Sequence, residues 1–161
     1  MGTEIERRFK LRKFPDLEAI PDPCATRHFL KQFYLAASEK GVVRVRVGES
    51  QQPVLAVKGP GLLTREEHEC EISASDEMLA LLKRMSCGSI EKERFSFITS
   101  QTDEYVIDCF CGAHVGLVIM EVEFSSEKKA AAYELPEWAE ALCEAEVTED
   151  PMYANSSLAM Q

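Results

Sequence analysis

The sequence predicts a mainly β (α+β) protein: a closed eight-stranded antiparallel barrel that forms a charged tunnel, with helices packed outside. Three observations favour this class. Glycine and proline interrupt the chain at short intervals, the segments between them alternate charged and apolar residues, and only one longer segment has clear amphipathic helix spacing. The 161 residues suffice for one core and are few for two, so we expect a single domain over 1–161.

Eight segments have the alternation and the bounding turn residues of strands. They lie near residues 3–10, 28–37, 42–48, 53–59, 66–73, 90–98, 103–111 and 117–125. Many of them are separated by short gaps that contain glycine or proline. Short connections join antiparallel neighbours, so we expect an antiparallel sheet.

The clearest helix covers residues 75–86, where Ser75 is a suitable N-cap and apolar residues from Met78 to Met85 form a stripe. A second helix is expected to begin with Pro136 and to carry Trp138. Both helices are expected to cover the barrel, and Glu137, Glu140, Glu144 and Glu146 to form a solvated helix face. Shorter helical segments are expected at 126–133, at 15–20, and as one turn after residue 150.

The overall charge argues against two classes of partner. There are 18 basic and 28 acidic side chains, a net charge of −10, whereas nonspecific binders of nucleic acid or anionic membranes are normally basic. No apolar run approaches the roughly 18 residues of a membrane span, and the N-terminus lacks the apolar region of a secretory signal. Six cysteines without a CxxC motif are expected to be reduced thiols. We therefore expect a cytoplasmic protein with neither nucleic-acid nor membrane partners.

The charged residues of the strands are sorted by sign. Acidic pairs lie on the first and eighth strands (Glu4, Glu6, Glu121, Glu123), and basic pairs lie on the third and sixth (Arg44, Arg46, Lys92, Arg94). Any one of these strands fits the solvated face of an ordinary sheet. The sorting across strands favours a barrel whose charged faces point inward, because buried charges persist only when paired or when they hold ions.

Such an interior has an evident chemistry. Carboxylates are oxygen ligands suited to Mg²⁺ or Mn²⁺. Arginine binds phosphate through its bidentate fork and lysine as a point charge. An interior lined by both signs is suited to a metal–polyphosphate complex.

The residues that carry this pattern resemble the CYTH superfamily, also called triphosphate tunnel metalloenzymes. The N-terminal Glu-x-Glu-x-Lys signature of that family appears as Glu4-Ile-Glu6-Arg-Arg8, with arginine in place of the lysine. Further matches follow in order along nearly the whole chain. Among them are Gln32-Phe-Tyr-Leu35, Val43-Arg-Val-Arg46, Ala56-Val-Lys-Gly59, Glu91-Lys-Glu-Arg94, Val106-Ile-Asp-Cys-Phe110 and Glu121-Val-Glu123. The length is similar to that of the small bacterial inorganic triphosphatases of the family.

The resemblance implies a role for each charged position. The implied metal ligands are Glu4, Glu6, Glu67, Glu69, Asp108, Glu121 and Glu123. The implied phosphate ligands are Arg8, Arg44, Arg46, Lys58, Arg65, Lys92 and Arg94. The sequence does not identify the general base, and the catalytic candidates are Lys92, Arg8 and Glu6. The Arg8 departure keeps the charge of the usual lysine but not its compact geometry.

The expected reaction is hydrolysis of inorganic tripolyphosphate to pyrophosphate and phosphate with Mg²⁺ or Mn²⁺. Two alternatives stay open. The tunnel would equally serve an organic triphosphate, as in a nucleoside or thiamine triphosphatase or a class IV adenylyl cyclase. It would also serve a noncatalytic module that binds polyphosphate or a nucleotide. The oligomeric state is undetermined, and a homodimer stays open.

Overall fold

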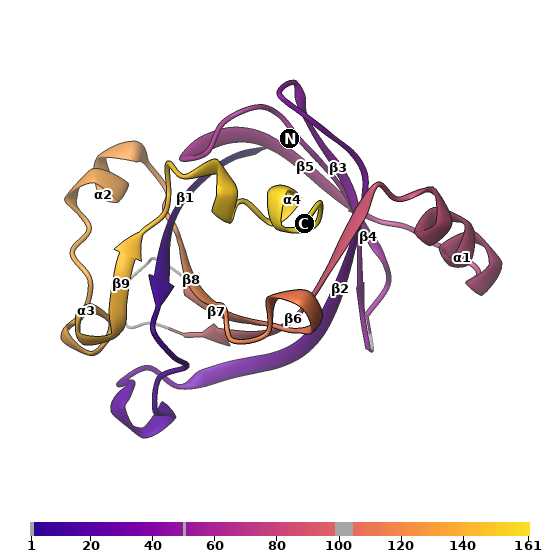
Figure 1. The fold of residues 1–161 in the computed structure, drawn as a ribbon. Coiled ribbons are helices and arrows are strands. Elements are labelled where there is room, and N and C mark those ends of the chain that lie inside the picture. The colour runs from indigo at the N-terminus through magenta and orange to yellow at the C-terminus, as the bar shows by residue number, and fades with distance from the viewer. Residues whose placement is uncertain (1, 50, 99–104) are drawn as a thin grey trace.

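A computed structural model describes residues 2–49, 51–98 and 105–161. Within them, nine strands form one antiparallel sheet in the order β5-β4-β3-β2-β6-β7-β8-β1-β9. A further pairing of β1 with β5 closes eight of these strands into a barrel, which is the architecture that the sequence predicted (Figure 1). The strands are β1 (Gly2–Leu11), β2 (Cys24–Ser38), β3 (Gly41–Gly48), β4 (Val54–Lys58), β5 (Thr64–Glu71), β6 (Gly88–Phe97), β7 (Tyr105–Phe110), β8 (Val118–Glu123) and β9 (Cys143–Glu146).

The helical elements are short. The α-helices are α1 (Asp76–Met85), α2 (Glu127–Ala132), α3 (Glu137–Leu142) and α4 (Asn155–Leu158), and the 3₁₀ turns are η1 (Leu17–Ala19), η2 (Gly112–His114) and η3 (Pro151–Tyr153). Each of the expected helical segments is confirmed, and Ser75 caps α1 by accepting a hydrogen bond from the backbone of Met78. Residues 103 and 104 of the expected seventh strand lie outside the described residues. Across the described chain, no helix has the length and apolar character needed to cross a bilayer.

The expected helix face of four glutamates is wrong in its second half, because α3 ends at Leu142 and β9 begins at the next residue. β9 pairs with Phe9–Leu11 of β1, along the edge where β5 has already left that strand. Lys10 Nζ lies 3.0 Å from a Glu144 oxygen, and Arg7 donates two hydrogen bonds of 2.8 and 2.7 Å to Glu146. An unpaired strand edge and these ion pairs override the helical pattern of a four-residue segment.

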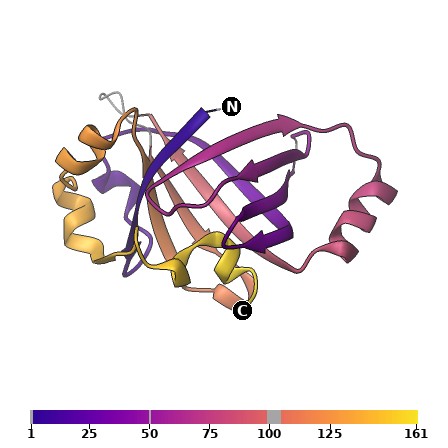
Figure 2. The same cartoon turned by 90° about the horizontal axis from the view of Figure 1, so that it is seen from above.

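The main core lies outside the barrel, where α2 and α3 cover the outer faces of β1, β7 and β8 (Figure 1). Phe9, Ile107, Met120 and Ala139 are all at most 2% exposed there. The expectation that α1 also covers the barrel is wrong: α1 buries none of its residues and projects from the opposite side (Figure 2). This helix only crosses from β5 to β6, and one side of its apolar stripe remains in solvent, with Met78, Leu81 and Met85 exposed.

Ile107→Ala should lower the free energy of unfolding by about 2–5 kcal/mol, because it leaves a cavity in the core between the barrel and its helices. Urea denaturation followed by circular dichroism measures this. Leu17→Ala is the control, since Leu17 is 45% exposed and its truncation should change stability by less than about 1 kcal/mol. Equal effects of the two substitutions would contradict this location of the core.

Candidate functional site

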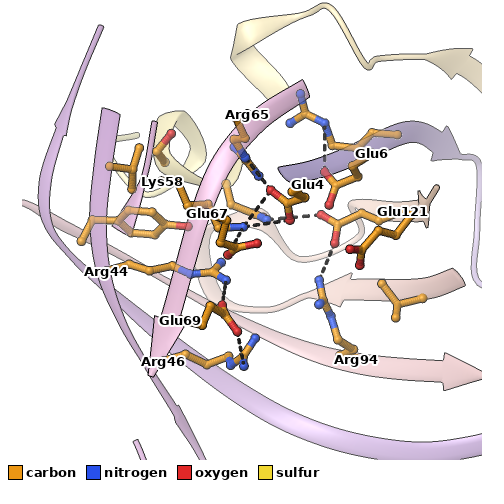
Figure 3. Close-up of a pocket in the computed structure, with 17 residues that line it drawn as sticks. Glu4, Glu6, Arg44, Arg46, Lys58, Arg65, Glu67, Glu69, Arg94 and Glu121 are labelled. Atoms are coloured by element: carbon orange, nitrogen blue, oxygen red, sulfur yellow. Dashed lines mark hydrogen bonds and ion pairs between the residues drawn. The ribbon is translucent and has the colours of Figure 1, made fainter. Parts of the chain in front are cut away.

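The interior of the barrel contains a cavity of about 170 Å³ that is lined mainly by charged side chains (Figure 3). Seventeen of the described residues line it. Six are basic (Arg8, Arg44, Arg46, Lys58, Arg65, Arg94) and six are acidic (Glu4, Glu6, Glu67, Glu69, Glu121, Glu123). All twelve are among the fourteen positions singled out in the sequence. They meet because side chains two apart on β1, β3, β5 and β8 point to the same, inward side.

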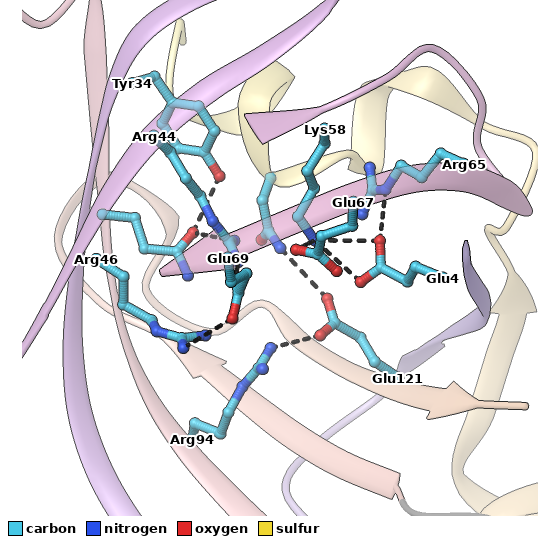
Figure 4. Close-up of polar contacts among 12 residues, drawn as sticks. Glu4, Tyr34, Arg44, Arg46, Lys58, Arg65, Glu67, Glu69, Arg94 and Glu121 are labelled. Carbon is cyan, nitrogen blue, oxygen red and sulfur yellow. Dashed lines mark hydrogen bonds and ion pairs between the residues drawn. The ribbon is translucent and has the colours of Figure 1, made fainter. Parts of the chain in front are cut away.

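One wall is organised around Glu4, which lies between two cations (Figure 4). Lys58 Nζ lies 2.9 and 3.1 Å from the two carboxylate oxygens of Glu4, and Arg65 Nε lies 2.6 Å from one of them. Burial by itself would raise the pKa of Glu4, but the charges of Lys58 and Arg65 outweigh burial and lower it. Lys58 also lies 2.8 Å from Glu67. Glu4 is therefore ionised and held in place.

The neighbouring strand β3 presents two arginines that share one carboxylate of β5. Glu69 accepts hydrogen bonds from Arg44 at 3.0 Å and from Arg46 at 3.3 Å. Arg44 also donates to the buried amide oxygen of Gln32, which in turn accepts the hydroxyl of Tyr34 at 3.0 Å. This buried chain fixes the direction of the Arg44 guanidinium, whereas Arg46 is held by Glu69 and is more exposed.

The floor of the cavity is a buried ion network on β6, β7 and β8. Arg94 donates to Asp108 at 2.7 and 2.6 Å and also bonds to Glu121, and Lys92 bonds to Asp108. Burial, followed by the charge of Arg94, lowers the pKa of Lys92. Burial opposes the ionisation of Glu121 too, but Lys92 and Arg94 prevail and keep its pKa well below the usual range.

Lys92 and Asp108 are the two singled-out positions that do not line the cavity. Both side chains are fully buried beneath it, and each is the other's partner. The same cavity includes Tyr34, Asn155 and Ser156, to which sequence reasoning assigned no role. Tyr34 lies inside the family-like motif Gln32-Phe-Tyr-Leu35, which was the available signal for it. Nothing in the strand pattern indicates that the last helix would reach the tunnel.

Negative charge is in excess around Glu6. Glu6 lies opposite Glu123 in the register of β1 and β8, and Arg8 Nε is 3.7 Å from its carboxylate. Burial raises the pKa of Glu6 to about 8, and the neighbouring carboxylates of Glu121 and Glu4 add to the effect. The raised pKa means that the negative charge of Glu6 is poorly compensated by its surroundings. A divalent cation bound beside Glu6 would supply the missing positive charge.

The donor set fits a hard divalent cation, because the side chains around Glu6 offer carboxylate oxygens. The described residues contain no group of three or more His, Cys, Asp or Glu side chains already gathered for a metal. Several of the carboxylates point instead at arginine or lysine. Binding of a cation would therefore require some of these ion pairs to rearrange.

Comparisons with known proteins give matches over nearly the whole chain. The model of the CYTH domain family matches residues 2–150. An inorganic triphosphatase of Nitrosomonas europaea is 33% identical, with 98% of this chain and 97% of the relative covered. An inorganic triphosphatase of Acetivibrio thermocellus is 32% identical, with 98% and 94% covered. The crystal structure of the inorganic triphosphatase NE1496 superposes with a TM-score of 0.67 at 30% identity, covering all of this chain and 97% of that one.

Glu6→Gln should remove a pH-dependent instability. A carboxyl whose pKa rises from 4.5 to about 8 on folding binds more protons when folded, so it costs stability as pH rises through that interval. We compare the free energy of unfolding of the variant with that of the wild type in the absence of metal. This difference should favour the variant more at pH 8.5 than at pH 5, by at least about 1 kcal/mol, the equivalent of one pKa unit. Thermal unfolding in chelator at both pH values measures this. Parallel pH profiles for the two proteins would contradict the assignment.

Proposed function

Because the chain belongs to the CYTH domain family, we propose that it hydrolyses inorganic tripolyphosphate to pyrophosphate and phosphate with the help of Mg²⁺ or Mn²⁺. The observation that carries this proposal is the lining of the tunnel by six cations and six carboxylates. If all are ionised, their charges cancel. Two divalent cations would then leave about +4, which matches a triphosphate of about −4 to −5 near neutral pH.

In this proposal, five of the six cations that line the cavity bind the substrate, namely Arg44, Arg46, Lys58, Arg65 and Arg94. Arg44 and Arg46 offer guanidinium groups from β3, Lys58 and Arg65 come from the adjoining strands β4 and β5, and Arg94 comes from β6. Arginine forks suit phosphate oxygens geometrically, and their fixed positions stabilise the charge that develops during transfer. Phosphate oxygens would compete with Glu69 for Arg44 and Arg46. The Glu69 carboxylate would therefore be released from these arginines when the substrate binds.

Glu4, Glu6, Glu121 and Glu123 would hold the divalent cations, and Glu67 and Glu69 of β5 line the same cavity. A bound metal would supply charge neutralisation on the phosphates and would make an attacking water more acidic. Of the three catalytic candidates, Glu6 is the one that lies among the other carboxylates of the tunnel, so its role in this proposal is to hold the metal. Lys92, which lies beneath the cavity, would act by holding Asp108 and hence Arg94 in place.

A substrate panel tests the function. Purified protein is given tripolyphosphate, ATP or thiamine triphosphate with Mg²⁺ or Mn²⁺, and phosphate and cyclic AMP are measured. The proposal requires the largest kcat/KM for tripolyphosphate. A larger value for an organic triphosphate, or cyclic AMP as the product, would assign the chain to the other enzymes. Tight binding of tripolyphosphate without turnover would identify a noncatalytic module.

Arg46→Ala should raise the KM for tripolyphosphate by about tenfold or more, because it removes a charge-assisted hydrogen bond to phosphate. Arg27→Ala is the matched control, since Arg27 pairs with Glu93 on the outer surface and its side chain is 66% exposed. Steady-state kinetics measures both variants. An unchanged KM for Arg46→Ala would show that this arginine does not contact the substrate.

A further inference from the structure

Arg8 lines the tunnel, but its guanidinium is directed at the backbone of the C-terminal segment. Nη2 donates to the carbonyl oxygen of Thr148 at 2.7 Å, and Nη1 donates to that of Tyr153 at 3.1 Å. The main chain of Arg8 adds two more links: its N–H donates to the Thr148 hydroxyl at 3.1 Å, and its carbonyl accepts from Val147 at 2.8 Å. Arg8 is only 3% exposed. Four hydrogen bonds therefore join this one residue of β1 to residues 147–153.

The segment that Arg8 holds leads directly into α4, which lies at one end of the barrel (Figures 1 and 2). The first residue of α4 is Asn155, whose side-chain amide donates to Glu121 at 3.3 Å. The other end of α4 is fixed separately, because His114 Nε2 lies 2.8 Å from the carbonyl oxygen of Leu158. The start of the helix, which reaches the tunnel, thus depends on the anchor at Arg8.

Glu121 receives one partner on each carboxylate oxygen. Arg94 bonds to Oε2 from the floor and Asn155 bonds to Oε1 from α4, so the carboxylate cannot rotate without losing one of them. Glu121 is also the residue opposite Arg8 in the register of β1 and β8. The two positions are therefore linked twice, once across the sheet and once through the C-terminal segment.

We propose that Arg8 is a positioning residue: it anchors residues 148–153 so that Asn155 orients the Glu121 carboxylate in the tunnel, and its terminal nitrogens do not contact phosphate. Arginine suits this task because its fork presents donors on two separate nitrogens, which reach two carbonyls at once, whereas lysine carries its donors on one nitrogen. Groups that orient a ligand carboxylate commonly affect activity almost as strongly as the ligand itself. The kinetic part of this inference rests on the proposed function; the structural part does not.

Arg8→Lys tests the anchor without any activity measurement. In metal-free buffer without substrate, amide hydrogen exchange across residues 153–160 should accelerate by at least about tenfold, the effect of losing one hydrogen bond to a charged group. Exchange of Ile107 and its neighbours in β7 should not change. Arg44→Lys is the matched control, since Arg44 bonds to Gln32 and Glu69 and not to this segment. Wild-type exchange in Arg8→Lys would overturn the proposal.

Kinetics then separates positioning from phosphate binding. Arg8→Lys and Asn155→Ala should each lower kcat for tripolyphosphate by about tenfold with KM within about twofold, and the double variant should be no slower than the slower single one. A raised KM with an unchanged kcat in Arg8→Lys would show a phosphate ligand instead. If Arg8→Lys does not fold, Asn155→Ala decides, and wild-type kcat in that variant overturns the proposal. An inactive wild type would refute the proposed function and leave the exchange result standing.

Discussion

Charge balance inside a closed sheet is the constraint on which the rest of this structure depends. A carboxylate or guanidinium removed from water is stable only when an opposite charge or an ion accompanies it. Here six cations and six carboxylates line the cavity, and most are paired across strands. The balance is uneven in space: Glu4, Glu69 and Glu121 have cations against them, whereas Glu6 faces mainly other carboxylates. Under the proposed function, that local excess of negative charge would hold the metal and the arginines would hold the phosphate chain.

An interior occupied by charge moves the apolar core to the outside of the barrel. Ile107 and Met120 point outward and are sealed by α2 and α3, while Lys92 and Asp108 point inward from neighbouring positions of the same sheet. The helices α2 and α3 cover only one side of the barrel. On the other side α1 buries none of its residues, and Met78, Leu81 and Met85 are exposed. The barrel therefore depends for stability on the layer formed by α2 and α3 and on a second buried apolar cluster, in which Leu158 of α4 packs with Tyr34, Ile90 and Phe110.

Much of the fold and of the site followed from a period of two. The alternation along β1, β3 and β8 placed Glu4, Arg44 and Glu123 on one face, and opposite signs on different strands indicated that this face was enclosed. Three features could not be read in that way. β9 forms because a free edge of β1 accepts it, although Cys143–Glu146 has no strand pattern of its own. Lys92 and Asp108 have the same pattern as their neighbours, but they lie one layer deeper because they pair with each other. The contact between Asn155 and Glu121 joins residues 34 positions apart through a short final helix, and no periodicity reports such a contact.

The direct test of the account is calorimetric titration of tripolyphosphate into the wild-type protein, with and without Mg²⁺. We expect one binding site per chain and an affinity that rises at least tenfold when Mg²⁺ is present, because the cation would neutralise the carboxylates around Glu6 that otherwise repel the phosphates. Raising the salt concentration should change the affinity less than it would for an exposed site, since the charges are enclosed. Absence of binding, or an affinity that is the same with and without the metal, would contradict the claim that the two signs of charge in this tunnel are matched to a metal and a phosphate chain.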